Sequence, residues 1–141
     1  MFKQRVITAI PLVLGFLALL FNLNPLNFSL VMVAIVLLAG WEWSNLMGLQ
    51  GRAQKIAYLA LLALTLGVTG LSLDLFGVLN VSLGQSLCLV ASCLWAVIFL
   101  WVQGYPSSAI LWSPRPILGL LGLVLLSITW VAIVLIIHQP H

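Results

Sequence analysis

The segment Phe28–Met47, FSLVMVAIVLLAGWEWSNLM, decides the fold, because it is as long as a membrane-spanning helix and carries a single charged residue, Glu42. A helix that crosses the hydrocarbon core of a bilayer needs about 20 predominantly apolar residues. A helix buried in a soluble protein can also lack charges, but this chain repeats the pattern in further apolar segments that leave no polar face for water. The segment therefore predicts a transmembrane helix in an integral membrane protein.

The composition of the whole chain agrees with this prediction. Of its 141 residues, 64% are hydrophobic and 5% are charged, which is far from the averages of soluble domains. The formal net charge is +3, but the basic residues are spread along the chain and form no patch, so nucleic-acid binding is not expected. We expect a single membrane domain over residues 1–141.

The apolar runs predict an all-α, polytopic membrane protein with five transmembrane helices. An asparagine-rich turn around Pro25 separates the first two, and the more polar segment 74–86 is expected to be a loop before the fourth. Ser113 is placed to cap the fifth helix. Gly67 and Gly70 are expected to share a face of the third, where a neighbouring backbone can approach. The predicted helices cover residues 5–21, 28–47, 56–73, 87–102 and 117–137.

The basic residues predict the orientation of the chain, since cytoplasmic loops carry an excess of Lys and Arg. With five spans, all the basic residues fall on one side of the membrane: Lys3, Arg5, Arg52, Lys55 and Arg115. The N-terminus is then cytoplasmic and the C-terminus lies on the far side. Aromatic residues that anchor helices at the interface are expected near the same boundary. These anchors are Trp41, Trp43, Trp101, Tyr105 and Trp112.

Glu42 is an acid inside a predicted span, and such residues are costly and commonly functional. It lies about 8 Å from the cytoplasmic end of its helix at a rise of 1.5 Å per residue, which allows partial hydration. Two interpretations stay open: a functional acid, or an anchor at the interface between Trp41 and Trp43. We expect an ion pair between Glu42 and Arg5, because a short turn joins the first two helices and both residues lie at the cytoplasmic face.

The remaining acidic and histidine residues predict no metal site and no catalytic residue. Asp74 falls on the opposite side of the membrane from Glu42, so the two cannot share a metal or act as a carboxylate pair. His138 and His141 are three residues apart, but Pro140 lies between them, and we expect a tail there.

Three segments carry a family resemblance. They are FKQRVITAIPLVLG (Phe2–Gly15), AGWEWSNLMGL (Ala39–Leu49) and YPSSAILW (Tyr105–Trp112). In order and spacing they resemble the N-terminal portion of the bacterial phosphatidate cytidylyltransferases, the CDP-diacylglycerol synthases. The resemblance covers this whole chain but about the first half of the family's length. It implies an inner-membrane enzyme of phospholipid biosynthesis that converts CTP and phosphatidate to CDP-diacylglycerol and diphosphate with Mg²⁺.

The resemblance also implies that the reacting groups are absent from this chain. The catalytic signature of the family is C-terminal, and no element of it matches here. Nucleotidyl transfer requires carboxylates that hold metal and several cations around the phosphates. We therefore expect an N-terminal membrane half that is inactive alone and binds no cofactor itself, with a second chain that supplies the missing half. Arg5, Arg52 and Lys55 are expected near the headgroup phosphates of membrane lipids, including phosphatidate.

A small non-enzymatic membrane subunit or scaffold is the alternative interpretation. In that case the Trp41–Trp43 element is an anchor, and the missing signature needs no explanation. The DNA downstream distinguishes the two, because the enzyme interpretation predicts that it encodes the aspartate-rich half.

Overall fold

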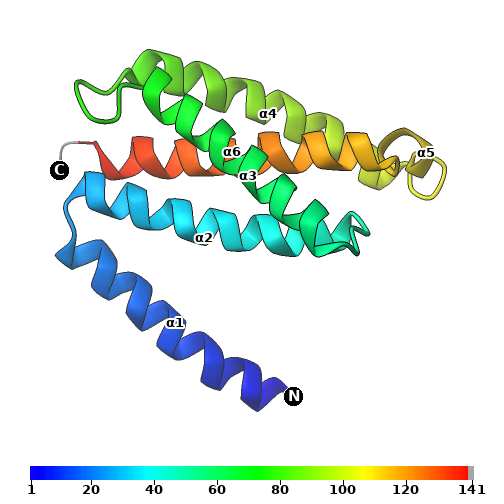
Figure 1. The fold of residues 1–141 in the computed structure, drawn as a ribbon, viewed down its shortest axis with the longest axis horizontal. Coiled ribbons are helices and arrows are strands. Elements are labelled where there is room, and N and C mark those ends of the chain that lie inside the picture. Colours follow the sequence, from blue (N-terminus) through cyan, green and yellow to red (C-terminus); the bar gives the residue numbers. More distant parts are fainter. Residues whose placement is uncertain (140–141) are drawn as a thin grey trace.

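The computed structural model describes residues 1–139, and helices make up most of that region (Figure 1). Five of them are long and apolar enough to cross a membrane, so the predicted all-α membrane fold with five spanning helices is confirmed. The helices are α1 (Phe2–Asn22), α2 (Pro25–Leu46), α3 (Arg52–Ser72), α4 (Val81–Gln103), the short α5 (Ala109–Trp112) and α6 (Arg115–Ile137).

Asparagine side chains cap two of the helices that begin earlier than predicted, α2 and α4. Asn80 accepts a hydrogen bond from the backbone N–H of Leu83 at 3.1 Å, so α4 begins at Val81 and the predicted loop is shorter than expected. Asn24 caps α2 in the same way, and Pro25 occupies the first turn of that helix, where a proline is tolerated. The predicted cap at Ser113 does not form, because Pro114 holds the N-cap position of α6 without a side-chain hydrogen bond.

The core of the bundle forms around α6, which packs against α2, α3 and α4 (Figure 1). Trp130 on α6 is 1% exposed, and its indole N–H donates to the carbonyl of Ser29 on α2 at 2.9 Å. Gly70 on α3 is buried beside this ring, because a Cβ at that position would lie 3.3 Å from it. Gly67, by contrast, is exposed, and a Cβ there would have no side chain or other helix within 4 Å, so the predicted close approach occurs at Gly70 alone.

Helix α1 stands apart from the bundle (Figure 1). None of its residues is buried, and it leaves α2 at the turn that contains Leu23 and Asn24. In a bilayer this arrangement is tolerated, because lipid tails solvate apolar side chains as well as a neighbouring helix does. The consequence for the candidate site is that the N-terminal residues are separated from the other helices.

Candidate functional site

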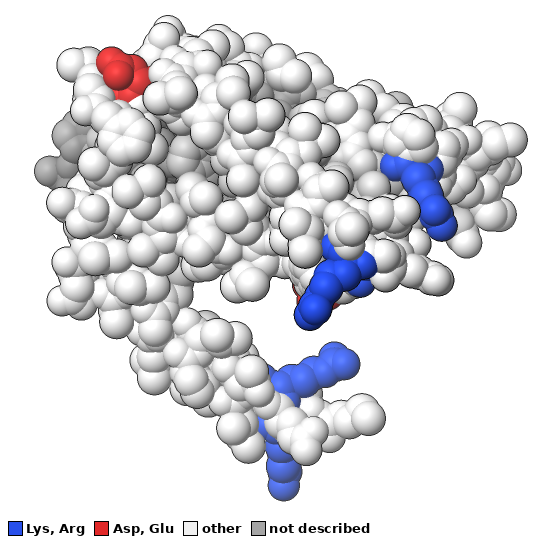
Figure 2. Space-filling view, in the orientation of Figure 1, with Lys and Arg blue, Asp and Glu red and all other residues white. Residues whose placement is uncertain are grey.

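The basic side chains lie at one end of the molecule. Arg52 and Lys55 are in the first turn of α3, and Arg115 begins α6. Because the spanning helices alternate in direction, these helices start at the same end (Figure 1). Figure 2 shows Lys and Arg in separate groups on the side where α1, α3 and α6 begin, and an acidic side chain at the opposite end, where the α3–α4 loop lies. We call this end, with Arg52, Lys55 and Arg115, the basic end.

Glu42 takes part in a polar chain at the basic end. Its carboxylate accepts a hydrogen bond from the side-chain amide of Asn45 at 3.4 Å. Asn45 in turn accepts one from the ammonium of Lys55 at 2.5 Å, and this ammonium lies 5.3 Å from the centre of the Trp41 ring. The cation near Glu42 is therefore Lys55 on α3, connected through an amide, with a cation–π contact to Trp41.

The structure does not bring Arg5 to Glu42, and the predicted ion pair is not among the interactions of residues 1–139. The physical reason is the position of α1, whose residues are all unburied and which diverges from α2 toward its N-terminus (Figure 1). The short turn fixes the helix ends at Asn22 and Pro25, but it does not keep the other ends together.

A substitution at Glu42 is expected to have little effect on stability. The side chain is exposed and its hydrogen bond to Asn45 is long, so Glu42→Gln should change the free energy of unfolding by less than about 1 kcal/mol. In double-mutant cycles, measured by unfolding in mixed micelles, we expect a coupling of about 0.5 kcal/mol between Lys55 and Glu42. No coupling is expected between Arg5 and Glu42. A larger coupling for the Arg5 pair would contradict the arrangement described above.

Two side chains fasten α2 and α3 to the first turns of α6. The indole N–H of Trp43 donates to the carbonyl of Leu118 at 2.9 Å, and the hydroxyl of Tyr58 donates to the carbonyl of Gly119 at 3.0 Å. A helix carbonyl can accept these bonds because it has two lone pairs. Gly122 makes room for both groups, since a Cβ there would overlap the Trp43 nitrogen and the Tyr58 oxygen. Three helices are thus fixed to one another at the basic end.

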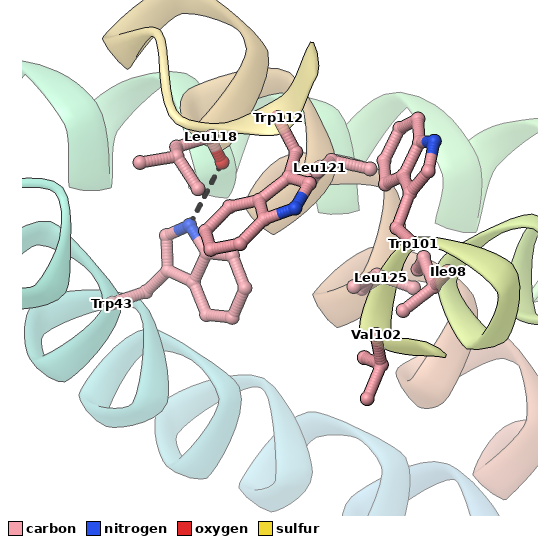
Figure 3. A pocket seen from close by; sticks show the side chains of 8 residues that line it. All are labelled: Trp43, Ile98, Trp101, Val102, Trp112, Leu118, Leu121 and Leu125. Atoms are coloured by element: carbon pink, nitrogen blue, oxygen red, sulfur yellow. Dashed lines mark hydrogen bonds between the residues drawn. The ribbon is translucent and has the colours of Figure 1, made fainter. Parts of the chain in front are cut away.

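An apolar pocket of about 220 Å³ lies beside this junction (Figure 3). Three tryptophans from α2, α4 and α5 contribute to it, namely Trp43, Trp101 and Trp112. Leucines at successive turns of α6 and two aliphatic side chains of α4 complete the lining. The α6 leucines are Leu118, Leu121 and Leu125. The pocket is partly open to the surface and lined by apolar side chains.

The predicted interface aromatics all lie near the basic end, but they have different neighbours. Trp41 lies beneath Lys55, while Trp43, Trp101 and Trp112 line the pocket. The ring of Tyr105 lies 6.4 Å from that of Trp112, centre to centre. Sequence reasoning placed these residues at one boundary but missed the pocket and the Trp43 and Tyr58 bonds. The small residues Gly119 and Gly122, one turn apart on α6, were the available signal.

The acidic and histidine groups do not converge on one place. Asp74, in the α3–α4 loop, accepts a hydrogen bond from the backbone of Val78 at 3.3 Å, at the opposite end from Glu42. His138 contacts the carbonyl of Val134 through Nδ1 at 2.8 Å, and His141 lies outside the described residues. Within residues 1–139, no three His, Cys, Asp or Glu side chains are close enough to hold a metal ion together.

Comparison with known proteins adds the family context. A model of the cytidylyltransferase family matches residues 3–140. The chain is 34% identical over 145 residues to a phosphatidate cytidylyltransferase of Haemophilus influenzae, covering 100% of this chain and 50% of the relative. It is 31% identical over 140 residues to one of Pseudomonas aeruginosa, covering 99% of this chain and 49% of the relative. No solved structure matches. The chain spans about half the length of the curated relatives it matches.

Proposed function

The chain belongs to the cytidylyltransferase family, and from this premise we propose that it forms the N-terminal membrane half of a phosphatidate cytidylyltransferase. The reaction of the complete enzyme converts CTP and phosphatidate to CDP-diacylglycerol and diphosphate. The observation that carries the proposal is the family match over residues 3–140 together with coverage of half of each relative. The role of this half is to hold the lipid side of the site in the membrane.

The chemistry of the chain supports the division into two halves. Transfer of a nucleotidyl group requires carboxylates that hold metal close to the reacting phosphates. Glu42, near the end of α2, and Asp74, in the α3–α4 loop, lie at opposite ends of the helix bundle and cannot form such a cluster. The Mg²⁺ of the complete enzyme is therefore assigned to the other half, and no catalytic step is assigned to residues of this chain.

Orientation and lipid contacts are part of the same proposal. The positive-inside rule supports an inner-membrane protein whose basic end faces the cytoplasm, where CTP is available. Arg5, Arg52 and Lys55 belong to helices that start at this end, and Arg5 and Arg52 are exposed. We assign them to the headgroup phosphates of surrounding lipids, phosphatidate among them.

The test is complementation between two halves. Membranes that contain this chain alone are expected to form no CDP-diacylglycerol from CTP and phosphatidate. Co-expression with the part of the Haemophilus influenzae relative that this chain does not match should give turnover, measured as transfer of label from CTP to lipid. The relative itself, split at the corresponding position, serves as the matched control.

Either of two outcomes would count against the proposal. Turnover by the chain alone would contradict the assignment of the reacting groups to the other half. If the split control is active while this chain inserts into the same membranes and restores no turnover, the enzyme assignment itself fails.

A further inference from the structure

We propose that the pocket beside Trp43 binds one acyl chain of an anionic phospholipid, whose phosphate is held by Arg115. This deepens the proposed function, on which it rests for the identity of the lipid, because it names residues that position a diacyl substrate. The pocket and the position of Arg115 are separate observations, and both point to an amphipathic ligand.

The apolar lining of the pocket favours a hydrocarbon group over water as its occupant. An apolar cavity of about 150 Å³ stays dry and binds benzene, because water requires polar partners. The pocket of about 220 Å³ is larger and is lined by the rings of Trp43, Trp101 and Trp112 and by leucines of α6. The indole N–H of Trp43 already donates a hydrogen bond to the carbonyl of Leu118, drawn as a dashed line in Figure 3. The space suits a hydrocarbon group.

The position of the pocket makes a lipid acyl chain the available hydrocarbon group. It lies between spanning helices, within one to three turns of the start of α6, and it is partly open. Most of its lining residues belong to helices that are long and apolar enough to cross a membrane, so acyl chains are the apolar groups at high local concentration. Tryptophans are the preferred residues at this depth, where headgroups meet hydrocarbon.

Arg115 supplies a positive charge on the helix that carries the leucines of the pocket, at the start of α6. It is exposed and lies one turn before Leu118, which begins the leucine row that lines the pocket. Its guanidinium lies beside the α2–α3 connection, because a Cβ on Gly48 would be 3.7 Å from Nη2. A guanidinium is well suited to bind a phosphate through two parallel hydrogen bonds. An arginine one turn nearer the basic end than an apolar pocket is complementary to a lipid with an anionic headgroup.

The experiment is photolabelling of the full chain in phosphatidylcholine vesicles. The probe is phosphatidate with a diazirine in one acyl chain, and adducts are mapped by peptide mass spectrometry. We expect adducts to concentrate on the peptides that contain Trp101, Trp112 and Leu121. Leu121→Trp, which fills the pocket, should reduce these adducts by about fivefold or more. Leu120→Trp places the same ring on the exposed face of α6 and should leave the adducts unchanged.

A second pair of variants tests the headgroup contact without altering the interior. Arg115→Gln should reduce labelling by the phosphatidate probe by about fivefold, the effect of one basic residue near an anionic lipid. Labelling by a phosphatidylcholine probe should not change. Lys3→Gln removes an exposed charge on α1, the helix that stands apart from the bundle, and is the control, with an expected effect of less than about twofold.

The outcomes show which lipid binds, and they distinguish failure of the pocket proposal from failure of the proposed function. The site is supported if unlabelled phosphatidate reduces photolabelling of the pocket. If phosphatidylglycerol reduces this labelling equally well, the site is supported as one that binds anionic lipids in general. Equal competition by phosphatidylcholine overturns the proposal, as does equal labelling of the Leu121→Trp and Leu120→Trp variants. Labelling requires no CTP and no turnover, so loss of the pocket adducts is distinguishable from failure of the two halves to complement each other.

Discussion

Replacing Gly122 by alanine is expected to lower the free energy of unfolding by about 2–4 kcal/mol. The added Cβ would overlap the indole nitrogen of Trp43 and the hydroxyl oxygen of Tyr58, so at least one of these groups must move. A displaced donor loses its hydrogen bond to the carbonyl of Leu118 or Gly119, which costs about 1–3 kcal/mol. The steric crowding adds a similar cost. The better helix propensity of alanine returns at most about 1 kcal/mol.

The measurement for this variant is equilibrium unfolding in mixed micelles, followed by circular dichroism. Gly67→Ala is the matched control, because Gly67 lies in a spanning helix with nothing within 4 Å of its Cβ position. This control should leave stability unchanged or raise it by up to about 1 kcal/mol. If Gly122→Ala behaves like Gly67→Ala, the junction at the start of α6 is not as tight as described.

Removing the side chain of Trp130 should also destabilise the protein, by about 3 kcal/mol. The ring is almost fully buried, and its N–H donates to the Ser29 carbonyl at 2.9 Å. Large-to-small changes of this kind in water-soluble proteins cost about 3–5 kcal/mol. We expect the lower end of that range, because transfer from lipid to the bundle interior adds no hydrophobic free energy and packing alone is lost.

Two comparisons check the interpretation of the Trp130 variant in the same unfolding measurement. Trp130→Phe keeps an aromatic ring and loses the hydrogen bond, so a cost of about 1–2 kcal/mol is expected. Trp95 on α4 is 56% exposed, and Trp95→Ala should cost less than about 1 kcal/mol. Equal effects of Trp130→Ala and Trp95→Ala would show that Trp130 has no special place in the core.

Hydropathy was sufficient to predict the spanning helices, because each must satisfy its own backbone hydrogen bonds and present an apolar surface to lipid. It was less informative about the helix ends. The start of α4 was placed too late because Ser82, Gln85 and Ser86 raise the polarity of its first turns, although Asn80 already offers a cap. A cap is a more reliable signal of a helix start than a rise in polarity.

The arrangement of the helices could not be predicted in the same way. In lipid, an apolar side chain that faces a neighbour looks the same in sequence as one that faces acyl chains, so periodicity does not identify the packed face. The detached position of α1 and the approach of Lys55 to Asn45 therefore had no signal in the pattern of charges. The close contact at Gly70 was predicted because small residues, unlike large apolar ones, do indicate where membrane helices pack together.

The pocket escaped prediction for a related reason. Trp43, Trp101 and Trp112 come from three segments, and the aromatic belt explains each of them separately. Only the packing of α2 and α4 on α6 brings them to one place. The family resemblance located these segments in an enzyme but did not indicate that their tryptophans enclose a space.

The central position of α6 has a consequence for biogenesis. The ribosome delivers α2 and α3 first, and these two helices pack against each other directly. Helix α4 follows, but its main contacts are with α6, so after insertion it has lipid as its principal neighbour until α6 arrives. The hairpin of α2 and α3 can assemble early, while the tertiary position of α4 is decided late. Assembly of the bundle is thus completed by the helix that is synthesised after the three it joins.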